Sequence, residues 1–172
     1  MELPKILATS PVTVQRVYAL PWLIHLVGDA HQPLHTSVRV DADGKWDKLG
    51  NGLEVHNPFN SRKPVTTLHA FWDDLPGPTW LRGTKLDAAS EALRAIHPRL
   101  VHSIRSDRWI EESWQLARDS AYPPGNESVP VITEAFHENS REIALLRVTQ
   151  AGYRLADLLN HWLRLERTAD QR

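Results

Sequence analysis

The stretch "HLVGDAHQPLH", residues His25–His35, places three histidines and one aspartate in eleven residues of otherwise apolar, helix-like sequence. His25 and Asp29 are four positions apart, so on a helix their side chains lie on one face, about one turn apart. That spacing allows two side chains to bind one metal ion. Pro33 ends the helical pattern, and His35 follows where the chain has turned and can present its imidazole toward the same region.

A second stretch, "LHAFWDD" at residues 68–74, repeats this spacing with His69 and Asp73. A single pair of this kind is also typical of a weak surface ion pair. Two pairs, one of them within an apolar helix, favour a metal site instead, because a buried carboxylate or imidazole is costly unless it is paired or coordinated. His31 falls on another side of the helix from Asp29, so we expect it to support the site or to be partly exposed.

The composition bounds the kind of protein. With 172 residues, 41% hydrophobic and 24% charged, the chain is expected to form a single globular domain over 1–172. The formal net charge of −1 provides no basic field that would attract nucleic acid or an anionic membrane, but it leaves metal-mediated phosphate binding open. The sequence has no cysteine, so a metal must use histidine, carboxylate or backbone ligands, which favours zinc, manganese or iron.

No targeting or membrane segment is evident. The N-terminal stretch "MELPKILATSPVTVQRV" lacks the apolar core and the small-residue cleavage pattern of a signal peptide. No apolar run approaches the roughly 20 residues that a membrane helix needs. We therefore expect a chain without a signal peptide and without a membrane partner.

Hydrophobic spacing predicts a mainly all-α fold, a helix bundle with a β-hairpin insertion at about 37–57. The hairpin would pair the alternating runs "SVRV" and "GLEV" across the turn-rich "DADGKWDKLGN". The predicted helices cover residues 11–32 (kinked or restarted at Pro21), 66–75, 85–104 (broken near Pro98), 106–122, and about 133 onward.

Two of these helices carry a predicted buried stripe. In the helix over 106–122 the stripe is Trp109, Ile110, Ala117 and either Ser113 or Trp114. In the last helix, apolar residues recur at intervals of three and four: Phe136, Ile143, Leu146, Tyr153, Ala156, Leu159 and Leu163.

The sequence resembles the zinc-dependent single-strand-specific nucleases of fungi, plants and bacteria, which share the zinc phospholipase C/nuclease fold. The resemblance rests on "WLIHLVGDAHQPLH", then Gly50-Asn51, then "LHAFWDD", and it continues through "WIEESWQLARDSAYP" and "AGYRLADLLNHWL" in the same order. It covers nearly the whole chain from about Val17.

The resemblance implies a trinuclear zinc site and an endonuclease that hydrolyses phosphodiester bonds of single-stranded DNA and RNA to 5′-phosphate products, in many members with 3′-nucleotidase activity. Carried over by motif, His25 and Asp29 would bind the first zinc, and Asp29 would bridge to the third. His35, His69 and Asp73 would hold the second zinc. A zinc-bound water would perform the hydrolysis. Family members are exported, which implies a secreted or periplasmic protein.

The chain departs from the family pattern in two places. Family members carry a further N-terminal segment with additional zinc ligands and with helices that cover the bundle. We therefore expect an N-terminally truncated chain that resembles the C-terminal two-thirds of such a nuclease, with one complete zinc site, an exposed apolar face and impaired activity. The second departure is Leu49 in "KLGNG", where the family usually has glycine.

Two other functions stay open at this point: a phospholipase C-like phosphodiesterase on the same fold, and a non-catalytic remnant that binds one zinc. A plain helix bundle with incidental histidines is the remaining alternative. For the nuclease, the partners would be single-stranded nucleic acid or nucleotides, with no protein partner evident. Substrate-binding candidates are Asn51, Trp46, Phe59 and Trp72, because aromatic rings stack on bases, although core or hairpin packing is the more common reason for aromatic residues in such positions.

Overall fold

The structure, a computed structural model, describes residues 2–77, 81–96, 103–125 and 127–169. It is mainly α-helical, as the hydrophobic spacing predicts. The elements in chain order are α1 (Leu3–Thr9), α2 (Thr13–Asp29), the 3-10 helix η1 (Pro33–Thr36), β1 (Glu54–His56), β2 (Val65–Thr67), α3 (Leu68–Asp74), α4 (Thr84–Arg94), α5 (Ser106–Ser120) and α6 (Glu134–Ala169).

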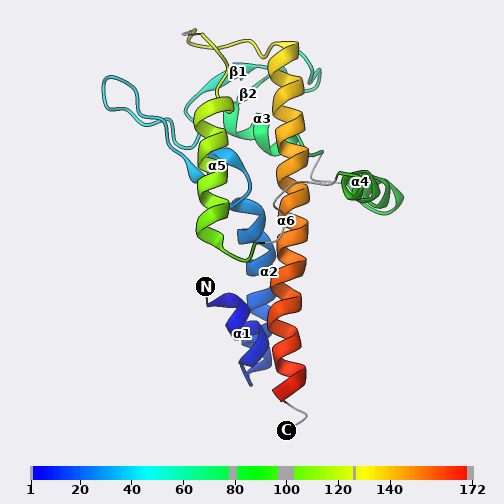
Figure 1. Ribbon diagram of the computed structural model, residues 1–172. Coiled ribbons are helices and arrows are strands. Elements are labelled where there is room, and N and C mark those ends of the chain that lie inside the picture. The colour runs from blue at the N-terminus through cyan, green and yellow to red at the C-terminus, as the bar shows by residue number, and fades with distance from the viewer. Residues whose placement is uncertain (1, 78–80, 97–102, 126, 170–172) are drawn as a thin grey trace.

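The long helix α6 runs the length of the molecule and organises the other elements (Figure 1). Helix α5 lies beside its first half, and α2 and α1 pack beside its second half. The strands and α3 gather at the end where α6 begins, while α4 stands to one side. None of the described helices combines the length and the apolar character needed to cross a membrane.

Two hydrophobic cores meet at the end of α2. One core surrounds Leu34, Phe71 and Trp72 and connects η1 and α3 to α5 and α6. The other surrounds Val27 and Trp109 and connects α1 and α2 to α5 and α6. Because the chain leaves α2 in one core and enters η1 in the other, the turn at residues 29–35 is held from both sides.

Helix α6 buries a different face from the predicted one. Its inward residues recur at intervals of three and four: Phe136, Ser140, Ala144, Arg147, Ala151, Arg154 and Leu158. The prediction was wrong for Tyr153, Ala156 and Leu163, which are exposed. The spacing of apolar residues predicted the wrong buried face because two inward positions of α6 hold arginine. An arginine is buried only where an acidic partner meets it, and here that partner comes from another helix.

That partner is Glu112 on α5, which accepts hydrogen bonds from Arg147 and Arg154. On the same helix Trp109, Ser113 and Ala117 are buried, so Ser113 is the correct one of the two predicted alternatives. Ile110 and Trp114 are instead 47% and 46% exposed, contrary to the prediction for Ile110. The inward face of α5 is thus partly polar, matching the arginines of α6.

The strand pairing also differs from the predicted hairpin. β1 pairs antiparallel with β2, which follows it in sequence, and not with residues 37–40. Val40 instead makes an isolated bridge to Trp46. In runs this short, the alternation of apolar residues does not specify which strand pairs with β1. Contacts with distant segments contribute: the His56 N–H donates to the Pro130 carbonyl, and the His56 carbonyl accepts from the Ile132 N–H.

Helix boundaries near the N-terminus also depart from the expected ones. The short helix α1 was not predicted, and the expected helix over 11–32 ends at Asp29, with η1 as a separate element. Helix α2 continues through Pro21 without a break in its assignment. Helix α4 ends at Arg94, and the expected break at Pro98 lies outside the described residues.

One side of α2 is apolar and exposed, as the sequence predicts. Its large side chains that remain accessible are Val14, Val17, Tyr18, Leu20, Trp22, Ile24 and Leu26. The helix is hydrophobic all round, and only part of its surface packs on α1 and α6.

The pKa of Glu112 provides a test of the contact between α5 and α6. Partial burial would raise this pKa, but hydrogen bonds from Arg154 and Arg147 outweigh that effect and lower it below the usual 4.5. Since the folded-state pKa is depressed, the contribution of Glu112 to stability is present above pH 4.5 and is lost as the pH falls through the folded-state value. We predict that Glu112→Gln is less stable than wild type at neutral pH and that this difference narrows in acid.

Denaturant unfolding of both proteins over a series of pH values measures this difference in the free energy of unfolding. A difference that stays constant from neutral pH into acid would contradict the ion pairing, because it would then not depend on the charge of the carboxylate.

Candidate metal centre

Three elements bring the predicted ligands together. Asp29 is the last residue of α2, His35 lies in η1, and His69 and Asp73 lie one turn apart on α3. Thr67 caps α3, since its side chain accepts a hydrogen bond from the Ala70 backbone N–H. The two helix pairs expected from the sequence are thus linked through His35, which contacts Asp29 on one side and Asp73 on the other.

The tightest group consists of His35, His69 and Asp73, whose ligand atoms all lie within 4.8 Å of one another. His69 Nε2 is 3.4 Å from Asp73 Oδ2, and His35 Nε2 is 3.5 Å from Asp73 Oδ1. The two imidazole rings stack with their centroids 4.9 Å apart. Two nitrogens and one carboxylate in this arrangement match a zinc site with three protein ligands.

Asp29 connects this group to His25. One oxygen of Asp29 lies 3.2 Å from His35 Nδ1, and the other lies 3.1 Å from His25 Nε2. The five predicted ligands therefore form a continuous row in which carboxylates alternate with imidazoles. His25, at the open end of the row, has a side chain that is 62% exposed.

One atom of the row has no partner that would explain its burial. His35 Nε2 is buried and makes no hydrogen bond among the described residues, since 3.5 Å to Asp73 is an ion-pair separation longer than a good hydrogen bond. Buried polar atoms are nearly always satisfied in proteins. A buried nitrogen that faces an imidazole and a carboxylate fits a metal ligand.

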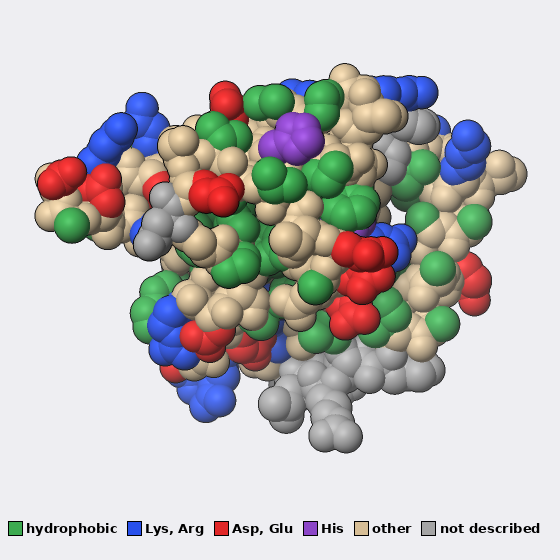
Figure 2. Space-filling view, turned by 90° about the horizontal axis from the view of Figure 1, so that it is seen from above, with side chains coloured by type: hydrophobic (Ala, Val, Ile, Leu, Met, Phe, Trp, Pro, Cys, Tyr) green, Lys and Arg blue, Asp and Glu red, His purple; other side chains and the backbone are tan. Residues whose placement is uncertain are grey.

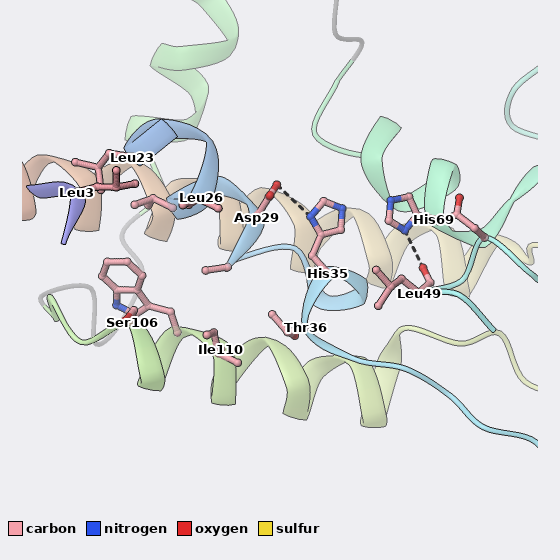
Figure 3. A pocket seen from close by; sticks show the side chains of 14 residues that line it. Leu3, Leu23, Leu26, Asp29, His35, Thr36, Leu49, His69, Ser106 and Ile110 are labelled. Carbon is pink, nitrogen blue, oxygen red and sulfur yellow. Dashed lines mark hydrogen bonds and ion pairs between the residues drawn. The ribbon is translucent and has the colours of Figure 1, made fainter. Parts of the chain in front are cut away.

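Groups behind the row orient two of the ligands. His69 Nδ1 donates to the Leu49 carbonyl at 2.7 Å, which leaves Nε2 free to face Asp73 (Figure 3). The Gln32 amide donates to Asp73 Oδ1 at 3.0 Å, and its oxygen accepts from the Leu34 N–H. Sequence reasoning missed Gln32, although it lies inside the "HQPLH" stretch.

Leu49, where the resemblance stated above predicts a glycine, adopts a left-handed backbone with a φ of 61°. A non-glycine residue rarely adopts this conformation, and it costs energy. Here the strained backbone directs the Leu49 carbonyl toward His69. The loop is also held by Asp47, which accepts a hydrogen bond from the Tyr122 hydroxyl at 2.6 Å.

The carboxylates shift the titration of the row. Asp73, followed by Asp29, raises the pKa of His35 above its usual 6.5 despite partial burial. Burial alone would raise the pKa of Asp73, but the neighbouring His35 imidazole and a hydrogen bond from Gln32 lower it instead. Asp73 therefore favours its anionic form, and His35 gains a proton more easily than a free imidazole does. A bound cation would take the place of that proton as the positive partner of the carboxylates.

His31 does not join the row. It is 2% exposed, so the alternative of a partly exposed side chain is wrong. Burial lowers its pKa to about 4, and the ring is therefore neutral at pH 7. Its Nδ1 lies 2.7 Å from the Val27 carbonyl and its Nε2 lies 2.9 Å from Arg154 Nη1, so the neutral tautomer with a proton on Nδ1 satisfies both contacts.

A pocket of about 730 Å³ opens beside the row. Asp29, His35 and His69 line it together with Asn51. The remaining wall is largely apolar, and in Figure 3 it extends from the imidazoles toward α1, α2 and α5: Leu3, Leu23, Leu26, Val27, Trp109 and Ile110. The polar row thus forms one part of a pocket that is otherwise hydrophobic.

The substrate-binding candidates differ in exposure. Trp72 is 1% exposed and donates its indole N–H to the Ala121 carbonyl, so it is a core residue with no free ring face. Trp46 is 55% exposed. Phe59 is also exposed but already stacks on His137 with ring centroids 4.4 Å apart. Asn51 is exposed at the pocket, and for it and Trp46 a role in substrate binding stays a prediction.

The fold and the row of ligands describe one class of protein: a mainly helical protein whose histidine and carboxylate side chains gather at the end of α2. The family model described as "S1/P1 Nuclease" matches residues 4–164, nearly the whole chain. The chain therefore belongs to the S1/P1 nuclease family.

Curated relatives agree with this assignment. The chain is 30% identical to Endonuclease 2 of Arabidopsis thaliana over 175 residues, covering 91% of this chain and 55% of the relative. It is 28% identical to Nuclease S1 of Aspergillus oryzae over 109 residues, covering 62% of this chain and 34% of the relative. It is 27% identical to Endonuclease 3 of Arabidopsis thaliana, covering 83% of this chain and 50% of the relative. The chain spans about half the length of these relatives or less.

Gly50 tests the loop that orients His69. It has a φ of 82°, and a Cβ added there would lie 2.9 Å from Leu34 Cδ1 and 3.2 Å from the His69 backbone nitrogen. We predict that Gly50→Ala lowers the free energy of unfolding by about 2–3 kcal/mol, because the substitution adds a steric clash to an unfavourable backbone conformation.

The matched control is Gly44→Ala, at a φ of 78° with no atom within 4 Å of the added Cβ. This variant carries the backbone penalty alone, about 1 kcal/mol. Denaturant unfolding compares the two. Equal losses would show that Gly50 does not make the close approach described.

Proposed function

We propose that this chain binds zinc through His35, His69 and Asp73 and acts as an endonuclease on single-stranded nucleic acid. The observation that carries this proposal is the convergence of three ligand atoms within 4.8 Å around the unpartnered His35 Nε2. The names of the relatives support the reaction class, since all three are nucleases or endonucleases. Products with 5′-phosphates and removal of 3′-phosphates from nucleotides belong to the same proposal.

The ligand count favours one complete zinc site. His35, His69 and Asp73 would hold the ion, whereas His25 and Asp29 contribute two donors that could begin a second site. A zinc ion bound here would act as a Lewis acid and lower the pKa of a water molecule. The protein's own part is orientation: Leu49 fixes the tautomer of His69, and Gln32 holds Asp73 in place.

Phosphate recognition would then be local. On the face shown in Figure 2, Lys and Arg side chains are scattered among Asp and Glu side chains toward the edges, in keeping with the net charge of −1. A bound cation would be the largest positive charge at the row. Selection of single strands would come from contacts between unpaired bases and the apolar wall of the pocket or the exposed Trp46.

The apolar wall also favours a second candidate function. A phospholipase C-like phosphodiesterase needs an apolar surface next to its metal centre, and Leu3, Leu23, Leu26 and Ile110 supply one here. The two functions separate in a direct comparison of single-stranded DNA with phosphatidylcholine vesicles. Release of phosphorylcholine without cleavage of DNA would replace the nuclease proposal with this one.

Zinc content is the first test. We predict about one zinc per chain after dialysis for wild type, and loss of that zinc in His69→Ala because the site has no spare protein ligand. The control is His137→Ala, which removes an imidazole stacked on Phe59. Elemental analysis measures all three proteins. Zinc stoichiometry in His69→Ala equal to that of wild type would refute the ligand assignment.

Cleavage is the second test. We predict hydrolysis of single-stranded DNA and RNA that EDTA abolishes and added zinc restores, with duplex DNA cleaved more slowly. Gel analysis of labelled oligonucleotides measures the cleavage. One bound zinc with no hydrolysis of any of these substrates would instead support the non-catalytic, one-zinc protein.

A further inference from the structure

The end of α2 is anchored by donors from two other helices. A helix normally leaves its last carbonyl groups without partners inside the helix. Here the Ala30 carbonyl accepts from the Ser113 hydroxyl at 2.7 Å, and the His31 carbonyl accepts from Arg147 Nε at 3.2 Å. The His31 ring is held as well, since its Nε2 lies 2.9 Å from Arg154 Nη1. These contacts fall on the residues between Asp29 and His35.

The donors Ser113, Arg147 and Arg154 are buried, and the two arginines share one partly buried acceptor, Glu112. We call these four residues the arginine clamp. Arg147 is 3% exposed and Arg154 is fully buried. Arg147 donates to the Ser113 hydroxyl at 2.6 Å and to Glu112 at 2.7 Å. Arg154 binds both oxygens of Glu112, at 2.7 and 2.9 Å. Ser113, Arg147 and Arg154 therefore each contact the turn, and Glu112 connects the two arginines.

The free-energy cost of burying charged groups indicates that this cluster does more than stabilise the fold. Two arginines and one glutamate lose much of their hydration in this position, and apolar side chains of similar size are often at least as stabilising. Buried polar groups, however, hold their neighbours in one geometry because alternative arrangements leave them unsatisfied. At the clamp the neighbour that is held is the turn at residues 29–35.

The turn must be held because the centre has two halves. His69 and Asp73 come from α3, which belongs to the core around Phe71 and Trp72. Asp29 and His35 come from the turn, whose preceding helix belongs to the core around Val27 and Trp109. A shift of the turn would change the distances from His35 to His69 and Asp73, and packing of Leu34 is the turn's anchor on the α3 side.

We propose that the arginine clamp is a positioning device that fixes the turn at residues 29–35, so that His35 faces His69 and Asp73 at the distance a metal ion requires. It acts through the Ala30 and His31 carbonyls and the His31 ring, and it touches none of the proposed zinc ligands directly. This inference rests on the zinc site proposed above and adds the residues that set its affinity.

Ser113→Ala tests the clamp with the smallest change. It removes the hydroxyl that links Arg147 to the Ala30 carbonyl and leaves the glutamate–arginine contacts in place. We expect the zinc dissociation constant to rise about tenfold, as for other groups that support a metal site. Competition with a chromogenic chelator measures this constant, and circular dichroism verifies that the metal-free protein is folded.

Ser140→Ala is the matched control. Ser140 is equally buried, but its hydroxyl has no hydrogen-bond partner in the part of the chain that the structure describes. We expect its zinc affinity to equal that of wild type. A role in stability alone would lower the unfolding midpoint of the metal-free Ser113→Ala protein and leave the zinc dissociation constant of the folded protein unchanged.

The same substitution in a His35→Ala background provides a second readout. In this background the weaker zinc binding left at His69 and Asp73 is measured at higher zinc concentration. Because the turn no longer supplies a zinc ligand there, Ser113→Ala should weaken that residual binding no further, so the two effects are non-additive. If Ser113→Ala does not fold, Arg147→Lys replaces it, because lysine keeps the charge but cannot reach Ser113 and the His31 carbonyl together.

The outcomes are distinct. A wild-type chain that binds no zinc overturns the proposed function and this inference together. Wild-type zinc binding that Ser113→Ala leaves unchanged overturns the inference alone, as does an equal loss with and without His35. A weaker zinc affinity in Ser113→Ala that disappears in the His35→Ala background supports the clamp.

Discussion

The contact between Glu112 and the two buried arginines of α6 is the interaction on which the rest of the structure depends. It decides which face of α6 turns inward, because Arg147 and Arg154 can be buried only where a carboxylate meets them. It also decides the orientation of α5, whose Glu112 and Ser113 must face the same side. Through these helices it holds the end of α2, from which the candidate metal centre begins.

The centre itself lies where the two hydrophobic cores meet. Val27 is buried in one core, Leu34 in the other, and the turn between them carries Asp29 and leads to His35. Close packing on both sides lets a short turn and the 3-10 helix η1 hold ligands in place. The opposite half of the centre is on α3, whose buried Phe71 and Trp72 point into the core while His69 and Asp73 point out of it.

The surroundings of the row suit a charged substrate that carries apolar groups. The imidazoles and carboxylates occupy one part of a pocket whose remaining wall is aliphatic and aromatic. Next to it, α2 exposes further apolar side chains, among them Trp22 and Leu26.

The sequence alone predicted the mainly helical class, the positions of most helices and the side chains that form the histidine–carboxylate row, because spacing along a helix specifies which side chains share a face. Only the tertiary structure decided the partner of β1, the inward arginines of α6, and the roles of Gln32 and His31. These features depend on contacts between segments far apart in sequence: His56 meets Pro130, Arg147 meets Glu112, and Gln32 meets Asp73. Local hydrophobic patterns carry no information about such partners, since the burial of a polar side chain follows from the group it meets across the fold.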